Sequence, residues 1–193
     1  MRIWFESLSN GIKIYCTLAP LFIAFALFFR KEQKQFNPFV FFINQLTVMY
    51  VICLLSVTLL PLPTAEQAAK LSTHDAQLVP FRFVSDIIRE KSLRSVAQVL
   101  FNIVLTAPLG LLLNLRGNIT PKKAAAITFA VSLFIEVAQL TGLFFIFSGS
   151  YRLFDVDDLF LNTLGGIAGY KTAAVPVIEH FRRNPVRVPV NQW

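Results

Sequence analysis

Long apolar stretches alternate with short basic connections along this sequence, and that pattern constrains the fold more than any other feature. A helix needs about 20 residues to cross roughly 30 Å of hydrocarbon. Five stretches have that length, and we expect transmembrane helices over Gly11–Phe29, Pro38–Leu60, Val96–Leu115, Ala124–Phe147 and Leu159–Ile178. The predicted fold class is therefore all-α: a polytopic helix bundle of about five spans that forms one membrane domain over residues 1–193.

Composition agrees with a membrane protein and argues against a nucleic-acid-binding one. Charged residues make up 15% of the chain and apolar residues 55%, whereas a soluble domain carries roughly 25% charged residues. The net charge of +7 comes from Lys and Arg in short clusters between apolar stretches. Such clusters suit membrane insertion and anionic headgroups. We therefore expect the lipid bilayer as a partner and no nucleic acid.

The basic connections also predict an orientation, because cytoplasmic loops are enriched in Lys and Arg. The connections after the first and third stretches and the tail after the fifth are basic, which places the C-terminus in the cytoplasm. The N-terminus and the loops 61–95 and 148–158 then lie outside. Loop 61–95 itself holds five basic residues, which counts against this orientation.

Loop 61–95 is the one long connection. Its first half, Leu62–Gln77, is polar and shows no pattern. From Val79 onward, apolar residues such as Phe83 and Ile87 alternate with charged residues at helical spacing. We expect an amphipathic helix here that lies on the outer leaflet and leads into the third span.

Glu136 lies near the middle of the fourth stretch, and Gln139 follows at a spacing that places both on one helix face. An ionisable residue inside a membrane is costly and commonly functional. A buried carboxylate needs a cation, a hydrogen-bond donor or a proton. The alternative is a structural hydrogen bond between helices.

An acidic cluster precedes the fifth stretch. Three carboxylates fall within four residues, beside one arginine: Arg152, Asp155, Asp157 and Asp158. They repel one another unless a cation is near, and a divalent ion such as Mg²⁺ supplies more charge than the arginine. In a helix, one stripe would carry Asp155, Asp158, Asn162, Gly165 and Gly169. The alternative is a solvated cap that holds the helix end at the membrane surface.

The third stretch contributes Asn102 and Pro108, and a proline frees backbone carbonyls that must find other partners. Gly165 and Gly169 are four residues apart, which favours close packing of another helix. By depth and helical phase, the polar groups of the third, fourth and fifth stretches converge. We expect them to meet at one polar cavity that opens outward.

Four blocks of sequence resemble the VanZ-like family of bacterial membrane proteins. They are Val79–Phe81, Asn102 with Pro108–Gly110, Ile135–Gln139 and Arg152–Tyr170. The resemblance covers residues 78–170, about half of the chain. The sequence departs from the family pattern at Phe101 and at Thr106–Ala107, outside the charged cluster.

The resemblance implies a multi-pass protein of the bacterial cytoplasmic membrane, associated with low-level resistance to teicoplanin and related lipoglycopeptides. It implies no established reaction. The family's polar positions correspond to Asn102, Glu136, Gln139, Arg152, Asp155, Asp157, Asp158 and Asn162.

Three functions stay open at this point. The first is non-enzymatic binding of a lipid, a lipid-linked cell-wall precursor or a partner protein at the outer leaflet, with the lipoglycopeptide as a further candidate partner. Its ligand-binding residues would be Asn102, Glu136, Gln139, Arg152, Asp155, Asp158 and Asn162. The second is a metal-dependent enzyme acting on a phosphate-containing lipid. In it Asp155, Asp157 and Asp158 hold Mg²⁺, and Glu136, Asp157 and Asp158 are the catalytic candidates. The third is ion or proton coupling through Glu136.

Overall fold

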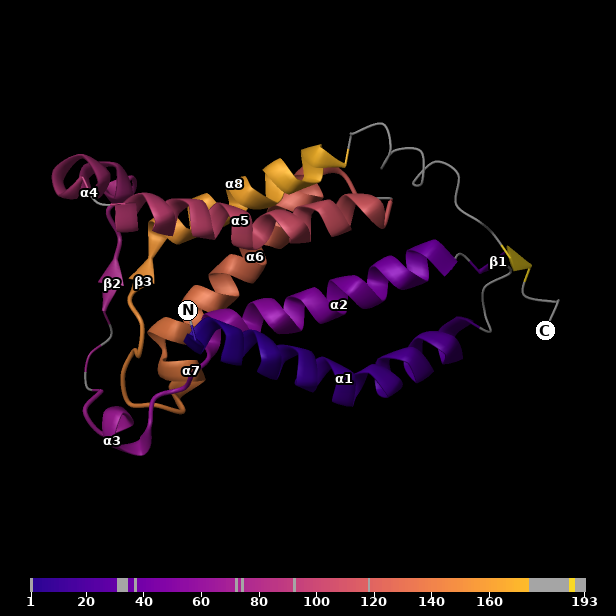
Figure 1. Cartoon of the computed structure of the whole chain (residues 1–193), viewed down its shortest axis with the longest axis horizontal. Coiled ribbons are helices and arrows are strands. Elements are labelled where there is room, and N and C mark those ends of the chain that lie inside the picture. The colour runs from indigo at the N-terminus through magenta and orange to yellow at the C-terminus, as the bar shows by residue number, and fades with distance from the viewer. Residues whose placement is uncertain are drawn as a thin grey trace.

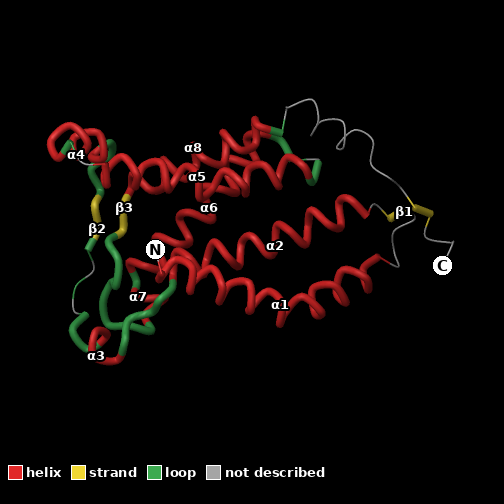
Figure 2. The backbone as a smooth tube through the Cα atoms, in the orientation of Figure 1, coloured by secondary structure: helices red, strands yellow, loops and turns green. Residues whose placement is uncertain are grey.

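The computed structural model describes residues 2–30, 35–36, 38–71, 73, 75–91, 93–117, 119–173 and 188–189. Most of these residues are helical (Figures 1 and 2). The long helices are α1 (Arg2–Arg30), α2 (Pro38–Leu59), α5 (Leu93–Leu115), α6 (Pro121–Leu140) and α8 (Val156–Thr172). The shorter helices are α3 (Ala65–Ala68), α4 (Arg82–Glu90) and α7 (Gly142–Phe145). Two-residue strands complete the fold: β1 (Gln35–Phe36) pairs antiparallel with β4 (Val188–Pro189), and β2 (Ala76–Gln77) pairs parallel with β3 (Phe154–Asp155).

Three helices of the described residues are long and apolar enough to cross a membrane. They are Phe39–Leu59, Leu93–Leu115 and Pro121–Leu140. These segments agree with the second and third predicted stretches and with most of the fourth. The chain is thus a helical membrane protein, as its composition predicts.

The predicted end of the fourth helix is wrong. Helix α6 stops at Leu140, not at Phe147. Gly142 has a φ of +60°, and Leu143 and Phe144 also have positive φ, so the chain turns sharply here. A Cβ on Gly142 would lie 2.5 Å from the carbonyl oxygen of Gly149, so only glycine fits this turn. Hydropathy does not detect such a turn, because the residues that make it are apolar.

The predicted start of the first helix is also wrong, because α1 begins at Arg2, nine residues before the predicted Gly11. The remaining ends of the long helices differ by smaller amounts. Helix α5 begins at Leu93, three residues before the predicted Val96. Helix α8 begins at Val156, and the predicted extension of the fifth span from 174 to 178 lies outside the described residues. The amphipathic helix predicted from Val79 onward is present as α4 and begins at Arg82.

Helices α5 and α8 pack unusually closely, side by side along their length (Figure 1). A Cβ on Gly169 would lie 1.8 Å from the carbonyl oxygen of Ala107, and one on Gly165 would lie 2.3 Å from that of Ile103. On the facing helix, a Cβ on Gly110 would lie 1.8 Å from the carbonyl oxygen of Gly166. The close-packing role predicted for Gly165 and Gly169 is confirmed.

The three short helices and the β2–β3 pair gather at one end of the bundle. Figure 1 shows the N-terminus, α3, α4, α7 and the β2–β3 pair at this end, whereas the α5–α6 connection lies at the opposite end. Strand β3 leads directly into α8, and pairing with β2 aligns Gln77 with Asp155. This end therefore positions the residues that precede α8.

Candidate functional site

Asp155 starts helix α8 as its N-cap. Its Oδ1 accepts a hydrogen bond from the backbone N–H of Asp157 at 2.9 Å, and another from Nε2 of Gln77 at 3.3 Å. An aspartate at the N-cap accepts a hydrogen bond from a backbone N–H that has no acceptor within the helix itself. Burial raises the pKa of Asp155, against the two hydrogen bonds that favour its charged form.

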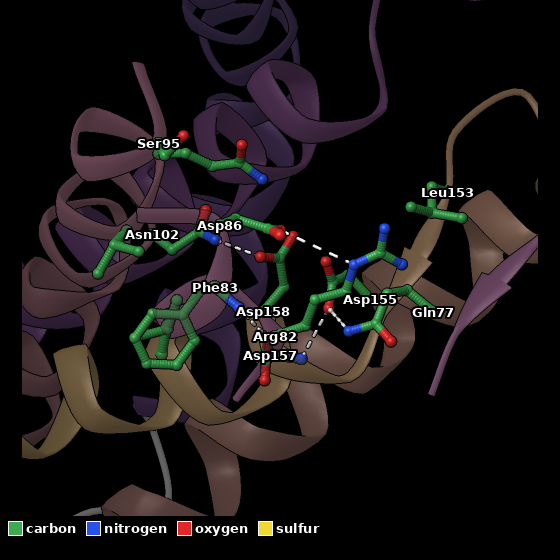
Figure 3. A pocket seen from close by; sticks show the side chains of 13 residues that line it. Gln77, Arg82, Phe83, Asp86, Ser95, Asn102, Leu153, Asp155, Asp157 and Asp158 are labelled. Atoms are coloured by element: carbon green, nitrogen blue, oxygen red, sulfur yellow. Dashed lines mark hydrogen bonds and ion pairs between the residues drawn. The ribbon is translucent and has the colours of Figure 1, made fainter. Parts of the chain in front are cut away.

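Asp157, next along the chain, holds the N-terminus of α4. Its Oδ1 accepts the backbone N–H of Phe81 at 2.6 Å. Its Oδ2 accepts that of Phe83 at 3.0 Å (Figure 3). Phe81 is the N-cap of α4 and supplies no side-chain hydrogen bond, so Asp157 takes over the capping. Only 3% of Asp157 is exposed, and both of its carboxylate oxygens are occupied by α4. Asp157 therefore ties α4 to the start of α8.

Two further carboxylates join α8 to α5 and α6. Glu136 of α6 accepts the backbone N–H of Asp155 on Oε2 at 2.9 Å. Asp158 accepts a hydrogen bond from Nδ2 of Asn102, which lies on α5. Glu136 is 3% exposed and Asn102 is 8% exposed, so these contacts are made within the bundle. Three helices are thus connected through the first turn of α8.

A cavity of about 800 Å³ opens beside this junction, bounded by α2, α5, α6, α8 and the segment before β3. Its wall includes all but one of the ligand-binding residues expected from the sequence: Asn102, Glu136, Gln139, Arg152, Asp158 and Asn162. The wall also has an apolar part, formed by Ala97, Phe101, Leu105, Ile135 and Leu153. The cavity is consequently amphipathic, with charged and amide groups facing the same space as an apolar surface.

Asp155 lies in a second, smaller cavity of about 210 Å³ (Figure 3). This cavity lies between α4, α5 and the start of α8, and Asn102 and Asp158 contribute to both cavities. Arg82 of α4 lines it and pairs with Asp86 at 3.8 Å. The two cavities are therefore neighbouring spaces that share Asn102 and Asp158 in their walls.

Arg152 brings a positive charge to the larger cavity. It is partly buried and donates from Nη2 to the carbonyl oxygen of Leu60 at 3.4 Å. Among the described residues, no carboxylate lies within ion-pair distance of Arg152. Beside it, the hydroxyl of Tyr151 donates to the carbonyl oxygen of Leu59, also at 3.4 Å. These two contacts fix the segment to the end of α2 without neutralising the arginine.

Gln139 and Asn162 make contacts deeper in the bundle. Nε2 of Gln139 donates to the carbonyl oxygen of Thr58 on α2 at 2.9 Å. Nδ2 of Asn162 donates to Oγ of Ser132 on α6, also at 2.9 Å. Both amides therefore connect neighbouring helices while they also line the cavity. For Gln139 this is the structural alternative that the sequence left open.

The three aspartates do not converge on one point. Oxygen ligands of a divalent cation must surround the ion at 2.0–2.6 Å. Here Asp157 faces α4, Asp155 faces its own helix and Gln77, and Asp158 faces Asn102. Within the described ranges, no group of three His, Cys, Asp or Glu residues is placed to hold a metal ion.

Several lining residues were missed by the sequence analysis. Arg94 and Gln98 precede Asn102 at intervals of four, so all three share one face of α5 and line the larger cavity. This spacing was a usable signal, but Arg94 was assigned to the loop. Gln77 is 5% exposed within a segment predicted to be unpatterned, and its burial depends on the β2–β3 pairing. No local signal predicts that pairing.

Among protein families, the model described as VanZ/LLP1 matches residues 47–177. The matched region includes most of α2 and all of α5, α6 and α8, which together line the larger cavity. No curated protein and no solved structure matches the chain.

Proposed function

The chain belongs to the VanZ/LLP1 family, and we propose that it is a cell-envelope membrane protein whose larger cavity binds an outer-leaflet lipid or a lipid-linked precursor. The observation that carries this proposal is the mixed character of the cavity wall. Arg152 and the amides of Gln139 and Asn162 face the same space as Phe101 and Leu105. A lipid has both parts: a polar headgroup for the first set and an apolar chain for the second.

The rigidity of the site supports binding. Glu136, Asp157 and Asp158 each hold a donor from another segment, so the cavity wall is fixed before a ligand arrives. A preformed site loses less entropy when it binds than one that must be ordered. The polar contacts of the bundle thereby serve structure and binding together.

The same contacts favour binding over the alternative of a metal-dependent lipid enzyme. A carboxylate that accepts backbone N–H groups on both oxygens, as Asp157 does, has little capacity left for a metal ion. The remaining candidates, Glu136 and Asp158, stand on separate helices and accept separate donors. Turnover of a labelled phospholipid by the purified protein would restore the enzyme alternative.

For the topology we propose five spans, with α1 and α8 added to the three helices that meet the length and composition criteria. The end that carries α3, α4 and the β2–β3 pair faces outward, together with the N-terminus, and the α5–α6 connection faces the cytoplasm. The C-terminal tail then also lies in the cytoplasm. In this orientation the larger cavity is at the level of the outer leaflet of the bacterial cytoplasmic membrane.

A link to lipoglycopeptide resistance follows from this location. Teicoplanin-like antibiotics act at the outer face of the membrane on lipid-linked cell-wall precursors. A protein that binds such a precursor, or a lipid that surrounds it, would reduce how well the antibiotic reaches its target. We therefore propose that the expected teicoplanin resistance is a consequence of lipid binding in the cavity.

Antibiotic susceptibility and precursor binding can be measured on the same set of variants. The wild type, Arg152→Ala, Ala97→Trp and Leu164→Ala are expressed in a sensitive host at matched membrane levels. Ala97 lines the cavity and is exposed, so tryptophan fills the space without entering the packed core. Leu164 is 43% exposed on α8 and is absent from the cavity wall, which makes Leu164→Ala a control.

We expect the wild type and Leu164→Ala to raise the inhibitory concentration of teicoplanin and to bind a fluorescent lipid-linked precursor saturably. Arg152→Ala and Ala97→Trp should lose both properties. If binding is saturable but susceptibility never changes, the resistance link is wrong and binding stands. If Ala97→Trp binds as well as the wild type, the cavity is not the binding site.

A further inference from the structure

Helix α4 presents an exposed apolar face at the end of the bundle that also carries α3 and α7. The N-cap residue Phe81 and the helix residues Val84 and Ile88 are all exposed, and their spacing places them on one side of the helix. Leu78 and Val79, just before the helix, are exposed as well. A contiguous exposed apolar surface marks a contact with a membrane or with another protein.

The start of α5 shows that the bilayer reaches this face. Leu93 is the first residue of a helix that is long and apolar enough to cross a membrane, and 88% of it is exposed. Val96 and Leu100 follow on the same side of α5 and are also exposed. Exposed apolar residues of a membrane span contact lipid, and α4 ends at Glu90, only three residues before Leu93. Helix α4 therefore lies at the level of the membrane surface.

Helix α4 also has the direction of a helix that lies along a membrane. Its two cap residues, Phe81 and Lys91, have positive φ, and the chain turns at both ends of the helix. Figures 1 and 2 show α4 running across the direction of α5 rather than along it. The ring of Phe81 packs edge-on against that of Phe160, an exposed residue of α8, with ring centroids 5.4 Å apart. The apolar face of α4 thus continues onto the exposed surface of α8.

The side of α4 away from this face is charged. Arg82 and Arg89 are exposed there, and Lys91 is exposed at the C-cap. Arg82 pairs with Asp86 at 3.8 Å, so that arginine is partly neutralised. The segment 78–95 carries four basic and two acidic residues, a net charge of +2. Basic residues beside an apolar face are typical of helices that bind anionic lipid surfaces.

We infer that α4 is an interfacial helix that docks on an anionic leaflet surface, with Phe81, Val84 and Ile88 in the lipid and Arg89 and Lys91 among the headgroups. This inference goes beyond the proposed function and does not depend on it, because none of these five residues is among those that line the larger cavity.

Two further observations bear on this docking surface. Leu93 already requires lipid beside α4, which favours the bilayer over a second protein as the occupant of the apolar face. Phe83 and Asp86 of the same helix line the smaller cavity. The docked helix therefore forms one wall of that cavity at the membrane surface.

A nitroxide spin label on Ile88→Cys reports what covers the apolar face. The full-length protein is placed in nanodiscs of phosphatidylcholine with or without phosphatidylglycerol. Cys16 is replaced by serine because it is exposed, whereas Cys53 is buried. Glu66→Cys on α3, an exposed position at the same end of the bundle, carries the control label. Val84→Cys gives the same measurement on the same face where Ile88→Cys fails to fold.

We expect the label at Ile88 to collide mainly with oxygen, which concentrates in lipid. The label at Glu66 should collide mainly with the neutral, water-soluble complex nickel ethylenediaminediacetate. An Ile88 label that meets the nickel complex as often as the Glu66 label does would place the face in water and overturn the inference. Low collision with both reagents at Ile88 would show that a second copy or another protein covers the face, and would overturn it too.

Amide hydrogen exchange over α4 tests the role of the headgroup charge. We expect slower exchange of α4 with phosphatidylglycerol than with phosphatidylcholine alone, and no difference in α3. A basic residue near an anionic surface strengthens binding about fivefold. Arg89→Gln and Lys91→Gln should therefore each reduce the protection of α4 about fivefold, and only in the phosphatidylglycerol nanodiscs.

Arg116→Gln is the matched control, because Arg116 is exposed at the opposite end of the bundle and its loss removes the same charge. It should leave the protection of α4 unchanged. Equal protection of wild-type α4 in the two kinds of nanodisc would overturn the preference for an anionic surface, even with the Ile88 label in lipid. Each of these outcomes can be read whether or not a lipid binds in the larger cavity.

Discussion

Oε2 of Glu136 accepts the backbone N–H of Asp155 at 2.9 Å, a contact that joins the buried face of α6 to the N-cap of α8. This is a hydrogen bond between a carboxylate and the backbone, and it fixes the segment that follows Arg152. Glu136, the one ionisable residue of the fourth predicted span, therefore positions the N-cap residue of α8. Its carboxylate has a donor rather than a cation as its partner.

Substitution of Glu136 should separate its acceptor role from its charge. Glu136→Gln keeps an oxygen for the N–H of Asp155, so we expect a small change in stability. Glu136→Leu leaves that N–H without an acceptor and should lower the free energy of unfolding by about 1–3 kcal/mol. Thermal unfolding in detergent measures both. An equal loss for the glutamine and leucine variants would show that the charge, which both substitutions remove, matters more than the hydrogen bond.

Asp157 should control the order of α4. In Asp157→Ala, the N–H groups of Phe81 and Phe83 lose their acceptors, at a cost of about 1–3 kcal/mol for each group left unpaired. We expect amide hydrogen exchange over α4 to accelerate while exchange in α5 changes little. Asp86→Asn is the control, because its ion pair with Arg82 is solvent-exposed and such pairs contribute about 0–1 kcal/mol. Equal effects of the two substitutions would contradict the capping role.

The glycine face of α8 should tolerate no side chain. In Gly169→Ala, the new Cβ would lie 1.8 Å from the carbonyl oxygen of Ala107, so α5 and α8 must separate. Overpacking costs about 1–3 kcal/mol even where side chains can move, and a backbone oxygen is less able to yield. We expect a marked loss of folded protein by size-exclusion chromatography. Ala168→Leu adds more volume on the exposed face of the same helix and should remain folded.

Asp155 should make stability depend on pH. Burial raises its pKa above the ordinary value of 3.8, so the folded protein holds this proton more tightly than the unfolded chain. The stability that protonation contributes is therefore present at low pH and lost as pH rises from about 3.8 through the raised pKa. Asp155→Asn keeps an oxygen for Asp157 and Gln77 and cannot ionise. Its melting temperature relative to wild type should rise across this window; parallel curves for the two proteins would contradict the assignment.

The sequence was sufficient to predict the long helices and much of the polar lining of the larger cavity. Hydropathy located α2 and α5 to within three residues, because apolar stretches of this length have one stable arrangement in lipid. Helical phase and depth brought Asn102, Glu136 and Asn162 toward one space, and the structure places all three in the wall of the larger cavity.

What the sequence did not predict depends on contacts between distant residues. Asp157 binds the backbone of Phe81 across 76 positions, and no pattern near Asp157 distinguishes this from a solvated cap or a metal ligand. The burial of Gln77 similarly requires a two-residue parallel pairing with Asp155.

The most direct test of lipid binding in the larger cavity is photo-crosslinking of a diazirine-bearing phosphatidylglycerol to the full-length protein in bilayer nanodiscs, with the labelled peptides identified by mass spectrometry. We predict saturable labelling on the segments that contain Phe101 and Ile135, competition by unlabelled phosphatidylglycerol, and loss of this labelling in Ala97→Trp. Labelling spread evenly over the lipid-facing residues, unchanged by competitor and by Ala97→Trp, would contradict a binding site in the cavity.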